Sequence, residues 1–270
     1  GMVGGVFAVA AYRMIPAVRS ILNGWNTFQN ASYSIDVVLE GMQEETIPEE
    51  DEETFSFTNS IEIDDLDFVF PDGGVILRHF HTTIHRGERI GVRGPSGSGK
   101  SSLFNILLGF FPPTGGSILI DGKKLTLSNR RQWHRLVGYV PQEIFIIQGS
   151  LADNIALGQP VIREKIDRVL EQVQLKDWAS ELPNGIDTPL GEFGSRLSGG
   201  QKQRIGIARA LYKDAEVLFF DEATSALDNN TEQEINAALQ ELSDSHKELT
   251  MIIIAHRESS LTFCDRIIDL

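Results

Sequence analysis

The hydrophobic pattern of the chain changes from a helical period near its N-terminus to short apolar runs after about residue 58. Residues 2–12 are apolar and uncharged, and the apolar positions that follow Arg13 recur at helical spacing as far as Met42. We therefore expect residues 6–42 to form one long helix. The apolar run is too short to cross a bilayer, because a membrane span takes about 20 such residues. The helix is then either an amphipathic helix docked on a core or the cytoplasmic end of a transmembrane helix that begins upstream.

An acidic stretch separates this helix from the rest of the chain. Residues 43–54 contain acidic side chains on both sides of Pro48. Because like charges repel one another and proline interrupts a helix, this stretch is typical of a solvated linker. We expect three regions, namely a helical remnant at 1–42, a linker at 43–58 and a globular domain at 59–270.

Beyond the linker, short apolar runs bounded by turn residues predict β-strands. The first runs favour antiparallel pairing, and they lie at 61–64, 66–70, 75–77 and 80–84. Further strands are expected at 89–92, 115–122, 137–142, 215–222 and 251–255, and helices at 103–108, 150–182, 198–211 and 230–242. This order predicts an α/β fold with a mixed sheet as its core, an antiparallel β subdomain and an inserted helical subdomain.

Composition excludes several classes of protein. The chain has 270 residues, which is one large domain or two small ones, and its 41% hydrophobic content is enough to bury a core. Cys264 is the only cysteine, which rules out an intrachain disulfide and a C-x-x-C metal site and fits a reduced cytosolic environment. The net charge of −14 argues against a nucleic-acid partner, which would need a basic surface.

One glycine-rich stretch lies between an expected strand and an expected helix. It reads Gly94-Pro95-Ser96-Gly97-Ser98-Gly99-Lys100-Ser101-Ser102, which matches the pattern G-x-x-x-x-G-K-[ST]. In that context the backbone N–H groups curl around a polyphosphate, and the helix N-terminus adds partial positive charge. Lys100 would reach the β- and γ-phosphates, and the Ser101 hydroxyl would ligate Mg²⁺. The pattern predicts that the chain binds a nucleoside triphosphate, against the alternative of an ordinary glycine-rich turn.

Two carboxylates follow the apolar strand expected at 215–222. Asp221 and Glu222 should lie at the carboxyl edge of the sheet, where open α/β sheets bind their ligands. Asp221 is the expected holder of Mg²⁺, and Glu222 is the expected base for the water that attacks the γ-phosphate. The alternative is an acidic strand end that faces solvent.

A second anion site is predicted where the helix at 198–211 begins. The residues Leu197-Ser198-Gly199-Gly200-Gln201 place small side chains and free N–H groups at a helix N-terminus. One triphosphate does not need two such helix N-termini from a single chain. Two chains that face each other would supply one each.

These motifs together resemble the nucleotide-binding domain of ATP-binding cassette (ABC) transporters, from about Ile61 to the C-terminus. The resemblance implies an ABC-type P-loop NTPase in which 94–102 is the Walker A motif and 217–221 the Walker B motif, with Glu222 as catalytic glutamate. It implies that 197–201 is the signature motif and 225–228 the D-loop. It also implies that Gln142 touches Mg²⁺ and the attacking water, and that His256 contacts the γ-phosphate.

The family further implies a head-to-tail dimer that buries two ATP molecules, each between one chain's phosphate loop and the other chain's Ser198 and Gly200. The catalytic residues would be Lys100, Gln142, Glu222 and His256, and the Mg²⁺ ligands Ser101, Gln142 and Asp221. Nucleotide-binding roles would fall to Phe70, to residues 94–102, and to Gln142, Ser198, Gly199, Gly200, Gln201, Asp228 and His256.

The sequence departs from the family pattern at a few positions. Phe70 stands where the family usually has a tyrosine that stacks on adenine, and it is either that stacking ring or a plain core residue. Stacking by phenylalanine would contribute roughly 1–3 kcal/mol, by analogy with nucleic-acid bases. Residues 192–194 read Glu-Phe-Gly where exporters often have Glu-Arg-Gly, and Glu258 replaces a usual leucine.

Other stretches are similar to exporters with fused membrane and ATPase domains. Residues 148–155 resemble the segment after the glutamine loop of such exporters, and 11–16 resemble the end of their last membrane helix. Residues 131–133 and 139–142 are similar to flippases of lipid-linked oligosaccharides. The chain stops at Asp269-Leu270, within what the family implies is a late strand.

The resemblance implies the ATPase domain of a half-transporter that exports or flips its cargo. The expected partners are a second such domain, in a homodimer, and a transmembrane domain. The expected location is the cytoplasmic face of a membrane, the inner membrane in a bacterium. Two alternatives stay open, namely a soluble ABC ATPase outside transport and a module that binds ATP only as a dimerisation switch. The sequence upstream of Gly1 would separate the first alternative from a transporter, and phosphate release would test the second.

Overall fold

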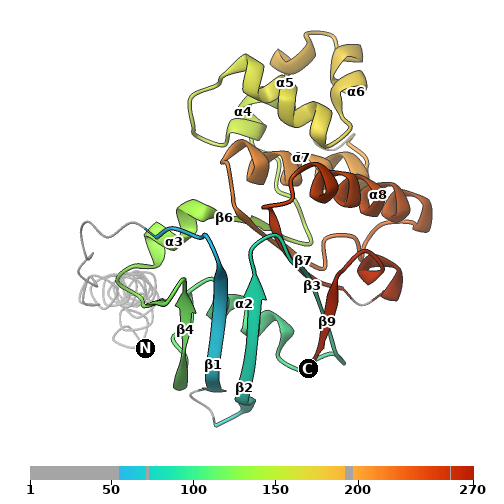
Figure 1. The fold of residues 1–270 in the computed structure, drawn as a ribbon. Helices are drawn as coiled ribbons and strands as arrows, with labels where there is room; N and C mark the ends of the chain where they lie inside the picture. The colour runs from blue at the N-terminus through green and yellow to red at the C-terminus, as the bar shows by residue number, and fades with distance from the viewer. Residues whose placement is uncertain (1–54, 71–72, 192–196, 256) are drawn as a thin grey trace, which may run out of the picture. The chain divides into compact units, whose positions relative to one another are not determined.

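The computed structural model describes residues 55–70, 73–191, 197–255 and 257–270 (Figure 1). The helix expected at 6–42 and the acidic residues 43–54 lie outside the described residues, so these expectations stay predictions. Within the described ranges, we find no helix with both the length and the apolar character that a membrane span requires.

An antiparallel sheet of four strands has the order β2-β1-β4-β5. Its strands are β1 (Ser60–Val69), β2 (Val75–His85), β4 (Gly115–Ile120) and β5 (Lys123–Lys124). The runs expected at 61–64 and 66–70 form one strand, β1, with an irregularity in its pairing between Ile63 and Leu66. Asp65 within that irregularity has a positive φ of 48°. Such a bulge keeps both apolar runs on the buried face.

A parallel sheet of five strands has the order β6-β7-β8-β3-β9. Its strands are β3 (Arg89–Arg93), β6 (Val137–Val140), β7 (Val217–Asp221), β8 (Thr250–Ile254) and β9 (Arg266–Asp269). The parallel and antiparallel strands therefore lie in two sheets rather than in one mixed sheet, which differs in detail from the expectation. The reason is that β3 pairs with β8 on one side and β9 on the other, which leaves no edge for β2.

Helices cover the parallel sheet. They are α2 (Lys100–Leu107), α7 (Gly199–Tyr212) and α8 (Asn229–Ser245), with α3 (Arg130–Leu136) before β6. The inserted helical subdomain consists of α4 (Leu151–Ala156), α5 (Arg163–Gln172) and α6 (Lys176–Glu181), followed by the short 3₁₀ turn η1 (Gly185–Asp187). The helical pattern expected across 150–182 is thus interrupted. Leu157 and Gly158 adopt positive φ angles of 44° and 87°, and Pro160 follows, which ends α4.

Successive side chains of the central strands point to opposite faces of the parallel sheet, and each face belongs to a different hydrophobic core. Val217 and Phe219 of β7 point into a core shared with α2 and the antiparallel sheet. Leu218 and Phe220 of the same strand point into a second core shared with α7 and the inserted helices. Because both faces of the sheet are covered, its strands read as continuous apolar runs.

The first core also holds α3 in place. Trp133 of α3 is completely buried, and its indole Nε1–H donates to the Leu107 carbonyl at 2.9 Å. Phe55 and Phe57 meet this indole edge-on, each with a centroid separation of 6.3 Å. The core therefore includes residues that precede the expected domain start at 59.

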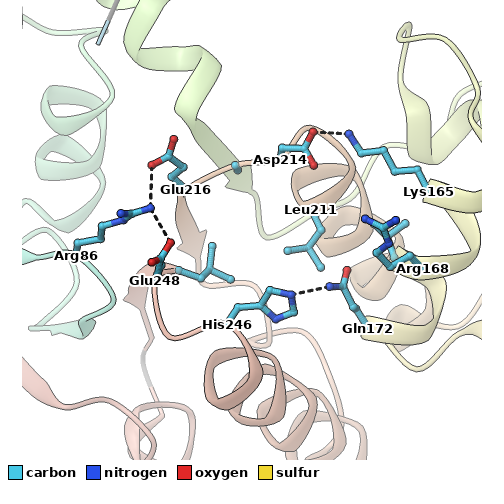
Figure 2. A pocket seen from close by; sticks show the side chains of 12 residues that line it. Arg86, Lys165, Arg168, Gln172, Leu211, Asp214, Glu216, His246 and Glu248 are labelled. Carbon is cyan, nitrogen blue, oxygen red and sulfur yellow. Dashed lines mark hydrogen bonds and ion pairs between the residues drawn. The ribbon is translucent and has the colours of Figure 1, made fainter. Parts of the chain in front are cut away.

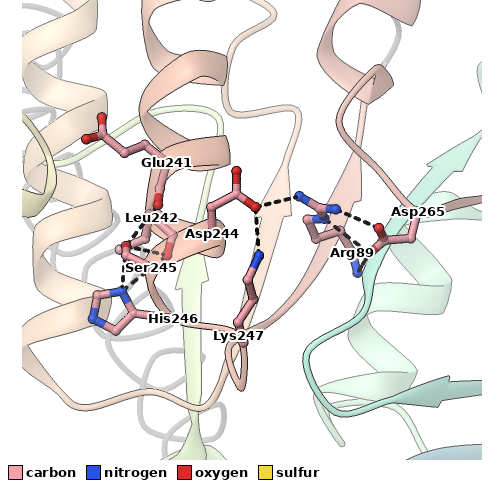
Figure 3. A network of polar contacts seen from close by, with 8 residues as sticks. All are labelled: Arg89, Glu241, Leu242, Asp244, Ser245, His246, Lys247 and Asp265. Carbon is pink, nitrogen blue, oxygen red and sulfur yellow. Dashed lines mark hydrogen bonds and ion pairs between the residues drawn. The ribbon is translucent and has the colours of Figure 1, made fainter.

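Charged side chains fasten the amino end of β3 (Figure 3). The Arg89 guanidinium donates to both carboxylate oxygens of Asp265, at 3.1 and 2.6 Å. It also lies 3.9 Å from Asp244 near the end of α8, and Lys247 pairs with the same carboxylate at 3.0 Å. The hydrogen bonds from Arg89 lower the pKa of Asp265. Strand β3 is thereby fixed against β9 and α8 at the end opposite its glycine-rich loop.

Candidate functional site

The loop between β3 and α2 has a backbone that only glycine fits at two positions. Gly97 and Gly99 have φ angles of 82° and 97°, in the left-handed region. A Cβ on Gly99 would lie 2.4 Å from the Ile76 side chain, and one on Gly94 would lie 2.5 Å from Ser98 Oγ. The glycines therefore set the close curl of the loop that the sequence predicted.

Lys100 lies at the start of α2 with its ammonium group folded over this loop. The residue is 5% exposed, and its Nζ donates to the carbonyls of Gly94 and Pro95, each at 2.9 Å. A buried cation at a helix N-terminus makes the interior of the loop attractive to an anion.

A pocket of about 270 Å³ opens in front of the loop. Its lining comprises Phe70, Ile76, Ser96, Gly97, Gly99, Lys100, Ser101, Ser102 and Glu222. The Ser98 hydroxyl is buried with no hydrogen-bond partner among the described residues. Ser98 itself is not among the residues that line the pocket. The Lys100 ammonium and the hydroxyls of Ser101 and Ser102 are in the lining, and these donors fit a polyphosphate.

Phe70 lies between the pocket and the core. Its ring is half-buried and meets Phe68 edge-on at a centroid distance of 5.1 Å, and Phe111 at 6.3 Å. The same ring lines the pocket. The packing against Phe68 fits the core alternative, whereas the position at the pocket fits a stacking ring, so the role in binding stays a prediction.

The two carboxylates lie at the carboxyl end of β7, as expected. Burial is the main factor that raises the pKa of Asp221, and the neighbouring Glu222 adds to it, whereas the Tyr139 hydroxyl and Lys100 oppose the rise. Glu222 has a positive φ of 51°, which is unusual for a residue with a side chain. Its N–H donates to the Ile254 carbonyl at 3.0 Å, which fixes the turn. The fold therefore places Glu222 on the pocket of the glycine-rich loop.

Tyr139 is a residue of this site that the sequence did not single out by role. It lies on β6, next to β7 in the sheet, and its hydroxyl donates to Asp221 Oδ2 at 2.9 Å. Burial and the Asp221 charge raise the pKa of Tyr139. The neutral hydroxyl therefore holds one of the two carboxylate oxygens of Asp221.

The side chains of Gln142 and Ser225 are in contact. The Gln142 side-chain amide donates to Ser225 Oγ at 3.0 Å, which joins the segment after β6 to the loop that follows β7. Gln142 is not among the described residues that line the pocket. Its expected contact with a metal ion stays a prediction.

The residues 197–201 lie at the beginning of α7, as expected. Ser198 is the N-cap: Gln201 N–H donates to Ser198 Oγ at 3.1 Å, and Ser198 N–H donates to Gln201 Oε1 at 2.9 Å. A Cβ on Gly199 would lie 2.7 Å from Leu227, and one on Gly200 would lie 2.5 Å from Thr231. This helix start thus packs against the segment that leads into α8.

Asp228 caps α8 in the same way. Its carboxylate accepts from Asn230 N–H and Thr231 N–H, each at 3.1 Å, and from Thr231 Oγ1 at 2.6 Å. The hydrogen bonds from Thr231 lower the pKa of Asp228. Neither Asp228 nor Ser198 lines the pocket of the glycine-rich loop, so one chain does not bring the two predicted anion sites together.

Two further expectations concern His256 and Mg²⁺. His256 lies outside the described residues, so its predicted role is not addressed by the structure. The described ranges contain no group of at least three His, Cys, Asp or Glu side chains with the geometry of a metal cage. Mg²⁺ bound to substrate phosphates does not need one, since it takes one or two protein ligands and keeps several waters.

A second pocket, of about 280 Å³, lies at the opposite edge of the parallel sheet (Figure 2). Glu216 and Leu249, which precede β7 and β8, are in its lining. Several of its charged side chains form ion pairs, namely Arg86 with Glu216 and Glu248, and Lys165 with Asp214, and Arg168 is a further cation in the lining. It lies at the amino ends of the strands, away from the carboxylates at their carboxyl ends.

Comparisons with known proteins match more than half of the chain in each case. The family profile described as "ABC transporter" matches residues 77–225. Among solved structures, that of a bacterial Atm1-family ABC exporter with ATP bound matches with a TM-score of 0.76 at 31% identity, over 91% of this chain and 44% of that one. The predicted fold class, a P-loop NTPase of the ABC type, is thereby confirmed.

Curated relatives carry one recurring name, "ATP-dependent lipid A-core flippase". The protein of Ralstonia nicotianae is 42% identical over 74% of this chain and 34% of its own length. The proteins of Paraburkholderia xenovorans and Burkholderia orbicola are 40% and 44% identical, over 77% and 68% of this chain and 35% and 30% of their own lengths. The chain thus spans about a third of the length of the curated relatives that it matches.

Proposed function

This chain belongs to the ABC transporter family, and we propose that it binds and hydrolyses ATP to drive transport by a half-transporter. The observation that carries the proposal is the meeting of Lys100, the glycine-rich loop and Glu222 around one pocket. Strand pairing of β3, β8 and β7 brings these residues together from distant parts of the sequence. A general base beside a phosphate cradle is what hydrolysis of a triphosphate requires.

The reaction is in-line attack of water on the γ-phosphorus. As the new P–O bond forms, the bond from phosphorus to the β–γ bridging oxygen breaks, and ADP leaves. Glu222 accepts the proton of the water, and the Lys100 ammonium stabilises the charge that spreads over the phosphate oxygens. Mg²⁺, when bound through Ser101, Asp221 and Gln142, would neutralise charge on the phosphates. His256 would contact the γ-phosphate.

The second half of each site would come from another copy of the chain. Ser198 and Gly200 lie at a helix N-terminus that is away from the pocket of their own chain. In the proposed homodimer, each ATP lies between the phosphate loop of one chain and Ser198 of the partner subunit. Phe70 would stack on the adenine.

The proposed cargo pathway lies in a transmembrane domain. Support comes from the flippase names of the relatives, of which this chain spans about a third, and from the likeness of residues 11–16 to the end of an exporter's membrane helix. We propose that the domain works at the cytoplasmic face of a membrane, in export or lipid flipping. The coding sequence upstream of Gly1 tests this, because a half-transporter would encode several apolar spans there, and their absence would favour a soluble ATPase.

Phosphate release by the purified chain tests the enzymatic proposal. With saturating ATP, release is expected in the presence of Mg²⁺ and is expected to stop when EDTA removes the metal. ATP binding without any phosphate release, at protein concentrations that allow dimerisation, would contradict hydrolysis and favour a dimerisation switch.

Replacing Tyr139 with phenylalanine is expected to lower the affinity of the site for Mg²⁺. The variant removes the hydroxyl that holds Asp221 Oδ2, and loss of such an outer contact commonly costs about tenfold in metal affinity. The measurement is the Mg²⁺ concentration that gives half-maximal ATP binding. Tyr212→Phe is the matched control, since that hydroxyl bonds Pro160 and Ile162 instead. An unchanged Mg²⁺ requirement in Tyr139→Phe would contradict a role of Tyr139 in metal binding.

A further inference from the structure

A buried carboxylate outside the pocket connects two loops that carry proposed catalytic residues. Glu232 lies in the first turn of α8, and its side chain is 2% exposed. Ser259 Oγ and Ser260 Oγ each donate to its Oε1 at 2.6 Å, and Arg257 Nη1 donates to its Oε2. These donors all come from the segment that begins immediately after His256. Glu232 therefore ties α8 to that segment.

The same segment is tied to the loop between β7 and α8. Arg257 Nη1 also donates to the Leu227 carbonyl at 3.3 Å and to Asn229 Oδ1 at 3.2 Å. A second link lies deeper, where the hydroxyls of Thr224 and Ser260 are 2.9 Å apart. The loop 222–228 carries Glu222 and Asp228, so both of its ends are connected to residues 257–260.

The charge of Glu232 is retained in spite of its burial. Burial alone would raise the pKa of this carboxyl group, but the hydrogen bonds from Ser259, Ser260 and Arg257 outweigh it and lower the pKa. A buried network whose members all have partners fixes one arrangement of the segments it joins. Glu232 is not in the lining of the pocket, so the nucleotide chemistry leaves this network unexplained.

We propose that Glu232 is a positioning residue that makes the loop 222–228 and the segment after His256 move as one unit. Through Arg257 and the two serines, it would keep the positions of Glu222 and His256 relative to each other constant during turnover. The inference rests on the proposed ATPase function. It predicts that loss of the network slows the chemical step while ATP still binds.

Glu232→Gln isolates the contact with Arg257. The oxygen of the new amide can still accept hydrogen bonds from the two serines. Its NH₂ group takes the place of Oε2, so two hydrogen-bond donors then face each other and the bond with Arg257 is lost. We expect kcat to fall about tenfold, which lies within the range for substitutions in a coupling network, and KM for ATP to change by less than about threefold. Arg257→Gln is the second variant, because its side chain is 41% exposed and its replacement is compatible with folding.

Two further variants test whether Glu232 and Arg257 act as a pair and show the effect of an unrelated substitution on the same helix. The double variant Glu232→Gln with Arg257→Gln places two amides opposite each other, and it is expected to recover part of the lost kcat. Glu234→Gln on the same helix is the matched control, since its side chain is 68% exposed, and it should keep kcat within about twofold. If the fold-losses in kcat of the two single variants simply multiply in the double variant, Glu232 and Arg257 do not act as a pair.

Hydrogen exchange provides a readout that does not depend on activity. In Glu232→Gln, amide exchange is expected to accelerate together in 222–229 and 257–261, while exchange in α2 stays as in wild type. Acceleration in only one segment, or wild-type kcat and exchange in both single variants, would overturn the proposal. A wild-type chain without phosphate release would contradict the ATPase function instead, and the exchange result would still decide whether Glu232 couples the two segments.

Discussion

The variant Glu222→Gln is expected to bind ATP as wild type does and to release phosphate about 10²–10⁴ times more slowly. Glutamine has nearly the shape of glutamate, so the turn at φ 51° and the N–H bond to Ile254 are kept. What is lost is the basic carboxylate that accepts a proton from the attacking water. The measurement is phosphate release at saturating Mg-ATP, with ATP binding measured on the same sample.

The matched control for this prediction is Glu164→Gln. Glu164 is an exposed carboxylate in the first turn of α5, in the inserted helical subdomain, so its neutralisation should leave turnover unchanged. Phosphate release by Glu222→Gln at the wild-type rate would remove Glu222 from the mechanism and leave its position at the pocket without a catalytic role.

Lys100→Ala is expected to weaken ATP binding about 10- to 100-fold, as loss of a hydrogen bond from a charged group does. Turnover of any ATP that still binds should fall by a further factor of about 10²–10³. The ammonium group that Gly94 and Pro95 hold over the loop is the buried cation that would meet the β- and γ-phosphates. Titration with a fluorescent ATP analogue measures the first effect.

Lys100→Met separates charge from packing in this experiment. Methionine keeps the apolar stem of the buried side chain, so the folded state should be retained while the charge is lost. Equal losses in the alanine and methionine variants would identify the ammonium group as the cause. ATP binding of wild-type strength in Lys100→Met would contradict the assignment of this lysine.

Local patterns were sufficient to predict the phosphate loop and the strand that carries the carboxylates. The run Val217–Phe220 is apolar because both of its faces are buried, and the two acidic residues after it mark the strand end. The start of α7 was also predictable, since Ser198 and Gln201 form a reciprocal cap that depends only on residues three apart.

Elements that depend on tertiary contacts could not be predicted in this way. Helix α3 has one buried residue, Trp133, and no periodic apolar face, so the helix depends on tertiary contacts such as the hydrogen bond from Trp133 to Leu107 and the packing of Phe55 and Phe57 on the indole. The contacts of Tyr139 with Asp221 and of Glu232 with Arg257 join residues far apart in the sequence. No spacing rule relates such residues, so only the folded chain brings them together.

ATP-dependent dimerisation of Glu222→Gln tests most directly the claim that two chains share each nucleotide. Mg-ATP is expected to move this variant from monomer to dimer in gel filtration, and adding Ser198→Arg is expected to abolish the dimer while ATP binding persists. Ser198 does not line the pocket of its own chain, so its substitution, which also removes the N-cap of α7, should leave ATP binding by that chain intact. A monomer with and without nucleotide, in a sample with measured ATP binding, would contradict the shared site.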